Sequence, residues 1–325
     1  MDIKHIPKKP LPAIYSWLGD RIFLTVIIVL GLSIILMTAG LALVTIVDGW
    51  EAIKEFGFIG FITGKVWDPG VNRTFGALPF LFGTAVTSVG SLALAFLPAV
   101  AIAVFISEYA APWLGKMIDN MVNLIAAVPS VVIGIWGIFV FAPWMRETVY
   151  LPIYNWAIEN NPSLLPILGN PIGYGMVSAT IILALMIIPF ITALTKDAID
   201  QVPVEQREAA YALGATHWEV IRMAVIPYAR GGILAGSILA FGRAIGETMA
   251  VAMLIGNKNT LPFSIFGPAA TMSSVIINEF REAVNSLHLS SLMAIGLVLF
   301  IISLLVNLLA AYITKKLAIG GGKTA

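Results

Sequence analysis

The chain has 325 residues, of which 59% are hydrophobic and 11% are charged, and its mean hydropathy is +0.93. Soluble domains carry about 25% charged residues, so this composition excludes a protein whose whole surface faces water. The formal net charge of +1 does not indicate nucleic-acid binding. The absence of cysteine excludes disulfides, thiolate metal ligands and cysteine nucleophiles.

Residues 1–21 form a polar, proline-containing segment ahead of the first apolar run. No short apolar region with a small-residue cleavage site stands out, so we expect the first run to be retained as a membrane helix. A helix needs about 20 apolar residues to cross the hydrocarbon core. Six runs meet this length: 22–47, 80–106, 121–142, 175–195, 232–256 and 290–313. Because these runs are continuous rather than alternating, they predict an all-α, polytopic protein with six transmembrane helices.

Lysine and arginine residues predict the orientation of the spans. With the N-terminus in the cytoplasm, the inner segments hold twelve of them and the outer segments hold six, while Arg243 lies inside a span. We therefore expect a multi-pass protein of the cytoplasmic membrane with both termini in the cytoplasm. The outer loops are then 48–75, 143–172 and 257–289. Within the last of these, segment 271–284 begins with the capping residue Thr271 and is expected to form a short outer helix.

The cytoplasmic loop between the fourth and fifth spans carries several helix start and stop signals. Pro203 suits the first turn of a helix, and Gly214 suits the position just after a helix end, where φ is positive. Thr216 and Glu219 predict a capping box that begins a second helix. Pro227 is expected to close this helix, because proline disfavours helix in the preceding residue. Such a helix pair could dock a partner protein, or it could be a connector that lies on the membrane surface.

The same loop resembles the EAA signature of the permease subunits of ABC importers. The signature is carried here by Glu208, Ala209 and Ala210, then Gly214, and finally Ile226 and Pro227. Ala224 stands where the signature has isoleucine, and Ile226 stands where it has leucine. Both replacements are apolar, so the packing role is kept. The resemblance implies that this loop couples the membrane helices to an ATP-binding subunit.

Other stretches resemble the phosphate-importer permeases of the PstC type. They are residues 236–257, which include the sequence GRAIGETMAV, residues 128–132, residues 276–280 and residues 288–290. The resemblance extends from about residue 75 to residue 313 and is weaker towards the N-terminus. It implies the fold of a type I ABC importer permease, which is also called MetI-like, and transport of inorganic phosphate by alternating access.

The resemblance also implies a domain organisation and a set of partners. Residues 1–21 would be a cytoplasmic segment and 22–75 the first transmembrane helix with its outer loop. Residues 76–316 would be the permease domain, with the coupling loop at 196–230, and 317–325 would be a cytoplasmic tail. The implied partners are a second permease subunit of the PstA type, two ATP-binding subunits of the PstB type and a periplasmic or lipid-anchored phosphate-binding protein of the PstS type. Membrane lipid surrounds such an assembly.

Arg243 and Glu247 are the only charged residues deep within any predicted span. They lie four residues apart, so one helix face would hold both and allow them to pair. An arginine at mid-membrane costs about 2.5–3.5 kcal/mol and normally faces a cavity or a partner. Its planar guanidinium matches phosphate oxygens, and Glu247 would hold it in place. The alternative is an ion pair that only fixes helix packing. The resemblance implies that both residues lie on the phosphate pathway.

No catalytic motif is present in the sequence. Residues 60–65 (GFITGK) are one residue short of a Walker A motif, and Val66 stands where that motif has serine or threonine. No H-E-x-x-H or G-x-S-x-G motif occurs, and we expect no cofactor or metal. We therefore expect a non-catalytic transport subunit that depends on ATP hydrolysis by a partner. Two alternatives remain, a permease for another oxyanion such as sulfate or molybdate, and a self-contained channel or secondary carrier.

Overall fold

The computed structural model describes residues 13–318. Residues 1–12 of the predicted cytoplasmic segment and residues 319–325 of the predicted tail lie outside the described residues. The chain divides after Val47 into two compact units. Of the described residues, the first unit holds the part of helix α1 (Ala13–Phe56) up to Val47, and the apolar sequence of α1 has the length and composition of a membrane span. The end of α1 and all other elements belong to the second unit, which begins at Asp48.

Among the described residues, six helical stretches are long and apolar enough to cross a membrane, as the sequence predicts. They are Gly19–Phe56, Leu78–Tyr109, Ser130–Asn160, Met176–Asp200, His217–Gly246 and Ser286–Lys316. The all-α fold and the six spans are therefore confirmed. The third and fifth spans differ from the expected boundaries.

The elements of the second unit alternate long helices with short connecting ones. The α-helices are α2 (Phe58–Thr63), α3 (Leu78–Val104), α4 (Pro112–Ala127), α5 (Ser130–Trp136), α6 (Ala142–Met145), α7 (Leu151–Asn160), α8 (Leu165–Leu168), α9 (Met176–Asp200), α10 (Val204–Ala212), α11 (His217–Val220), α12 (Ile226–Gly246), α13 (Met249–Leu254), α14 (Met272–Glu279) and α15 (Ser286–Ala318). π-Helical turns at Phe105–Tyr109, Gly137–Phe141, Arg146–Tyr150 and Ile221–Val225 join or extend several of them, and Pro162–Leu164 is a 3₁₀ turn. Strands β1 (Trp67–Asp68) and β2 (Thr74–Phe75) form an antiparallel hairpin.

The third span begins later and ends later than the predicted range 121–142. Helix α4 ends at Ala127 because Val128 precedes a proline and is extended, with ψ of 126°. A new helix begins after Pro129 and continues through two π-helical turns to Asn160. Much of the predicted outer loop 143–172 is thus helical. Hydropathy did not reveal this extension, because it carries exposed polar residues.

The fifth span begins earlier and ends earlier than the predicted range 232–256. The second helix of the cytoplasmic loop does not stop at Pro227 but runs from His217 to Gly246, so the predicted closure at Pro227 is wrong. A π-helical turn at Ile221–Val225 directly precedes the proline. The extra residue in this wider turn lets the chain pass the proline ring, which would otherwise meet the carbonyl of the preceding turn.

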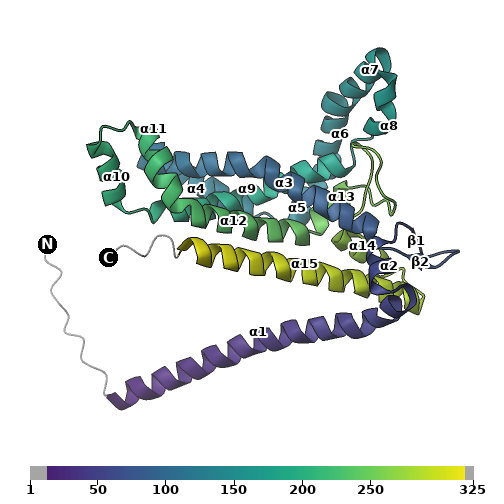
Figure 1. The fold of residues 1–325 in the computed structure, drawn as a ribbon, viewed down its shortest axis with the longest axis horizontal. Helices are drawn as coiled ribbons and strands as arrows, with labels where there is room; N and C mark the ends of the chain where they lie inside the picture. The colour runs from purple at the N-terminus through teal and green to yellow at the C-terminus, as the bar shows by residue number, and fades with distance from the viewer. Residues whose placement is uncertain (1–12, 319–325) are drawn as a thin grey trace. The chain divides into compact units, whose positions relative to one another are not determined.

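Helix α9 lies at the centre of the second unit, against α3, α4 and α12, while α12 also packs on α15 (Figure 1). Its large apolar side chains Ile182, Leu183, Ile187 and Ile191 are fully buried. Close approach is essential at Gly236, where an added Cβ would lie 2.7 Å from the Cβ of Leu194. This core places α10 and α11 at one end of the second unit, and α14 with the β1–β2 hairpin at the other (Figure 1).

The β1–β2 hairpin is closed by Asp68, which accepts backbone hydrogen bonds from Gly70, Val71 and Asn72. These bonds favour the ionised carboxylate and lower the pKa of Asp68 below its ordinary value of 3.8. A lowered carboxyl pKa stabilises the folded turn above the ordinary value, and this contribution is lost as the pH falls through the lowered one. At neutral pH this stabilising contribution is therefore present in full.

Candidate functional site

The cytoplasmic loop folds as a helix, a glycine corner and a second helix, as its sequence predicts. Helix α10 follows Pro203, and Gly214 turns the chain with φ of +86°. Thr216 begins the second helix through a capping box, in which its backbone N–H and its hydroxyl both donate to Glu219 Oε2 at 2.8 Å. The predicted glycine after the first helix and the predicted capping box of the second helix are therefore both confirmed.

One arginine fastens the loop to the body of the unit. Arg207 Nη2 donates to Glu108 Oε1 at 2.8 Å, and Nε donates to the same oxygen at 3.3 Å. Nη1 and Nη2 also donate to the backbone carbonyls of Val202 and Ile199. The Glu108 side chain is 7% exposed and that of Arg207 is 21% exposed, so this charged pair is largely removed from water.

A histidine adds a second connection between the same two segments. His217 Nε2 lies 3.1 Å from the backbone oxygen of Glu108, while Nδ1 pairs with the hydroxyl of Tyr211. The ring of Tyr109 meets the His217 ring edge-on, with centroids 4.8 Å apart. Both helices of the pair are thus tied to the π-helical turn that ends the span beginning with α3. These contacts couple the helix pair to that span.

Breaking the arginine connection is expected to destabilise the protein. Arg207→Met leaves the nearly buried carboxylate of Glu108 without its charged partner, a loss of about 3 kcal/mol. The thermal unfolding midpoint of the detergent-solubilised protein should fall measurably, and Arg207→Met combined with Glu108→Met should recover part of the loss. The control is Arg230→Met, which removes an exposed arginine of α12. An equal fall in the control would show that the pair has no special role.

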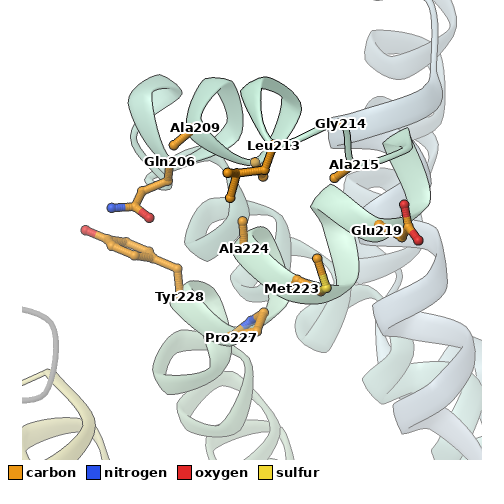
Figure 2. Close-up of a pocket in the computed structure, with 11 residues that line it drawn as sticks. Gln206, Ala209, Leu213, Gly214, Ala215, Glu219, Met223, Ala224, Pro227 and Tyr228 are labelled. Carbon is orange, nitrogen blue, oxygen red and sulfur yellow. The ribbon is translucent and has the colours of Figure 1, made fainter.

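An open groove with a volume of about 660 Å³ lies between α10 and the beginning of the long fifth span (Figure 2). Leu213 and Ala224 face each other across it, while Gln206 and Tyr228 lie at one end and Glu219 at the other (Figure 2). Leu213 is 90% exposed and Met223 is 63% exposed. Large apolar side chains left open to water in a groove are typical of a surface that binds another protein.

The groove brings together four of the six predicted coupling residues, namely Ala209, Ala210, Gly214 and Pro227. Glu208 is exposed but does not line the groove. Ile226 packs instead on the buried cluster formed around Ile199 and Val225, and lines a separate apolar groove. Four of the predicted residues therefore share one groove, whereas Glu208 and Ile226 lie outside it.

Arg243 and Glu247 are not paired as the sequence predicts. Helix α12 ends at Gly246, and Glu247 is extended with φ of −65° and ψ of 128°. The two residues therefore do not share a helix face, and none of the ion pairs among residues 13–318 joins them. The spacing argument fails because it assumed an unbroken helix through Glu247.

Arg243 lies instead in the last turn of α12, with its guanidinium carbon 3.9 Å from the centre of the Phe190 ring. A cation is favoured at a helix C-terminus, and an aromatic face attracts it further. Arg243 is nevertheless exposed on this chain. Because an arginine in a membrane span faces a cavity or a partner rather than lipid, this surface of α12 is a candidate pathway wall. No spacing rule connects Phe190 with Arg243, so this contact was not predictable from the sequence.

The backbone at the interruption after Gly246 is hydrogen-bonded to a residue from another segment. The Ser273 hydroxyl donates to the backbone oxygen of Glu247 at 2.8 Å. Met249 then begins α13, so the span resumes after two non-helical residues. Broken helices that expose backbone groups at membrane depth occur in membrane proteins only where protein or a water-filled cavity surrounds them. Among the described residues, no cluster of histidine and acidic side chains could hold a metal ion.

The sequence is similar to a known protein family and to several named proteins. The family described as binding-protein-dependent transport system inner membrane component matches residues 99–319. The phosphate transport system permease protein PstC of Mesorhizobium japonicum is 42% identical, over 92% of this chain and 91% of its own length. The protein of the same name from Haemophilus influenzae is 37% identical, over 95% and 96%. A probable PstC from Methanocaldococcus jannaschii is 34% identical, over 82% and 84%.

Solved structures with a similar fold are also ABC transporters. A chain of a bacterial transporter involved in the import of the acidic polysaccharide alginate aligns with a TM-score of 0.58 at 16% identity, covering 93% of this chain and 96% of that chain. A chain of the MetNI methionine transporter in an inward-facing conformation aligns with a TM-score of 0.55 at 16% identity, covering 78% and 99%. At this identity the likeness shows the fold alone, and it confirms the predicted MetI-like fold.

Proposed function

The chain belongs to the family of binding-protein-dependent transport system inner membrane components, and from this premise we propose that it is the permease subunit of an ATP-driven importer of inorganic phosphate. The observation that carries the proposal is the similarity, over nearly the whole chain, to permeases named for phosphate transport. The exposed Arg243 beside a break in its span supports the same cargo, because a guanidinium presents two parallel donors to phosphate oxygens.

The partners follow from the same premise. A second permease subunit of the PstA type would complete the pathway, two ATP-binding subunits of the PstB type would supply energy, and a phosphate-binding protein of the PstS type would deliver the cargo. The excess of lysine and arginine in the predicted inner segments supports an orientation with both termini in the cytoplasm. In this orientation α10 and α11 face the ATP-binding subunits.

Coupling would take place at the groove between α10 and the fifth span. Its open apolar residues Leu213 and Met223 offer a contact surface to an ATP-binding subunit, and Glu208 and Ala209 lie exposed beside them. Arg207 fixes the helix pair to the span that begins with α3, so a push on the groove would move that span and the fifth span together. ATP binding would thereby open the pathway outward, and hydrolysis would return it inward.

Arg243 would contact phosphate transiently as the cargo passes. Among the described residues, its guanidinium contacts the face of the Phe190 ring and no carboxylate. The attraction of an aromatic ring for a cation is weak compared with that of a carboxylate. The guanidinium is therefore available to an oxyanion without first breaking an ion pair. Glu247, placed just past the helix end, would contribute its extended backbone and a negative charge to the same stretch of the pathway. This repulsive charge would limit how tightly phosphate is held.

The test is uptake of labelled phosphate into proteoliposomes that contain the assembled transporter. Uptake should require ATP and the binding protein, and an excess of sulfate or molybdate should leave it unchanged. Inhibition of phosphate uptake by either anion would favour the alternative oxyanion permease. Uptake by the purified chain alone, without an ATP-binding subunit, would favour a self-contained carrier and contradict the proposal.

A further inference from the structure

Helix α14 is fastened at its first turn to the broken span. Ser273 is 5% exposed, and its hydroxyl reaches across 26 residues of sequence to the Glu247 backbone oxygen. That oxygen lies just past the end of α12, where helix carbonyls lack partners within their own helix. The bond therefore fixes the backbone at the break, and it does so from a helix at the end of the unit opposite α10 and α11 (Figure 1).

The last residue of α14 is held by three separate segments. Glu279 Oε2 accepts hydrogen bonds from Trp67 Nε1 and from His288 Nε2, both at 2.8 Å, and Oε1 accepts one from Asn259 Nδ2. The Glu279 side chain is 14% exposed. A carboxylate at a helix C-terminus is opposed by the helix dipole. A glutamate at this position therefore does not stabilise α14 itself. Its presence is explained by the three hydrogen bonds that its carboxylate accepts from other segments.

Two of the three donors are themselves fixed by aromatic packing. The Trp67 ring meets Phe75 and Phe80 edge-on, with centroids 4.9 Å away in each case. The His288 ring stacks on Phe75 with centroids 5.3 Å apart. The β1–β2 hairpin and α15 thus present their donors from a rigid cluster, and Glu279 docks α14 onto it.

The helix between these two ends is short and well held. Thr271 caps it in a capping box with Ser274, and the backbone N–H of Met272 donates to Thr84 of α3 at 3.0 Å. Six residues separate Ser273 from Glu279, a helical rise of about 9 Å. A capped helix of this length, buried along its first turn, transmits a displacement rather than absorbing it.

We propose that α14 is a rigid link through which the Glu279 network sets the position of Glu247, so that Ser273 and Glu279 are positioning residues for the pathway. The pathway role of Glu247 rests on the proposed function, whereas the link itself does not. A movement of the outer hairpin or of α15, such as docking of a binding protein would produce, reaches the break in the fifth span through this helix.

The absence of cysteine from the chain makes a direct test possible. Thr248→Cys places a single nitroxide label beside Glu247 in the assembled transporter, once accessible cysteines of the other subunits have been replaced. Ser273→Ala and Glu279→Gln should each increase the motion of this label in its electron paramagnetic resonance spectrum. Ser291→Ala is the matched control, because this buried serine bonds only to Leu287 of its own helix. The control spectrum should be unchanged.

Uptake of phosphate per assembled transporter, measured without the label, is the second readout. Losing one hydrogen bond of the link should lower it about three- to tenfold, and the double variant should be no worse than the poorer single one, because both bonds belong to one link. Unchanged motion of the label in Glu279→Gln would overturn the proposal. An equal increase of this motion in Ser273→Ala, Glu279→Gln and the control Ser291→Ala would overturn it as well. Increased motion of the label in the two link variants, with unchanged phosphate uptake, would support the link and contradict only the pathway role of Glu247.

Discussion

Arg243→Gln is expected to assemble normally and to lower phosphate uptake by at least about tenfold. Glutamine keeps a polar side chain with an amide donor but is shorter, and it loses the charge and the planar fork of parallel donors. Hydrogen bonds to charged groups contribute about 1.5–3 kcal/mol, and each 1.4 kcal/mol corresponds to a factor of ten. The measurement is ATP-dependent uptake of labelled phosphate, normalised to the amount of assembled transporter.

Two further variants separate charge from geometry at this position. Arg243→Lys restores the charge without the planar fork and should recover part of the rate. Arg230→Gln removes an exposed arginine from the same helix at a distance of thirteen residues and should leave uptake near the parental value. If Arg243→Gln transports phosphate at the parental rate, the guanidinium has no place on the pathway.

Gly214→Val is expected to uncouple ATP hydrolysis from transport. Gly214 has φ of +86°, a conformation that costs most residues about 1–2 kcal/mol and is rarest for β-branched ones. The corner between α10 and α11 would relax to another angle, and the groove that includes Leu213 would lose its shape. Stimulation of ATP hydrolysis by the binding protein should fall together with phosphate uptake, while basal hydrolysis by the ATP-binding subunits should persist.

The same position offers a control of matched size. No atom lies within 4 Å of a Cβ added at Gly214, so the Cβ itself meets no obstacle and the main effect of a substitution is on the backbone conformation. Asparagine tolerates positive φ, and Gly214→Asn should therefore keep most of the coupling. Equal loss in both variants would show that the groove requires an open surface at this point rather than a particular corner.

The sequence predicted those parts of the fold that depend on adjacent residues. The corner at Gly214 and the box of Thr216 and Glu219 were readable because a cap is formed within four residues of chain. The six spans were readable because hydrocarbon demands long apolar runs wherever they pack. The MetI-like fold itself came from the resemblance, since no local rule specifies how six such helices are arranged.

Features that depend on tertiary contacts were not predictable from local rules. The helix continues past Pro227 because a π-helical turn precedes it, and nothing in the residues of that turn signals its width. The break after Gly246 is stabilised by Ser273, 26 residues away in sequence, so the pairing of Arg243 with Glu247 was predicted on a helix that does not exist there. Arg207 and Glu108 lie 99 residues apart, beyond any spacing rule.

Continuity of the helix through Pro227 has a mechanical consequence. Arg243 lies sixteen residues after Pro227, so one stiff helical segment of about 24 Å joins the groove to the guanidinium within the membrane. A tilt of about 10° would swing the guanidinium by about 4 Å, which exceeds the length of a hydrogen bond. Pressure at one end could thus make and release a phosphate contact at the other without any local rearrangement around Arg243.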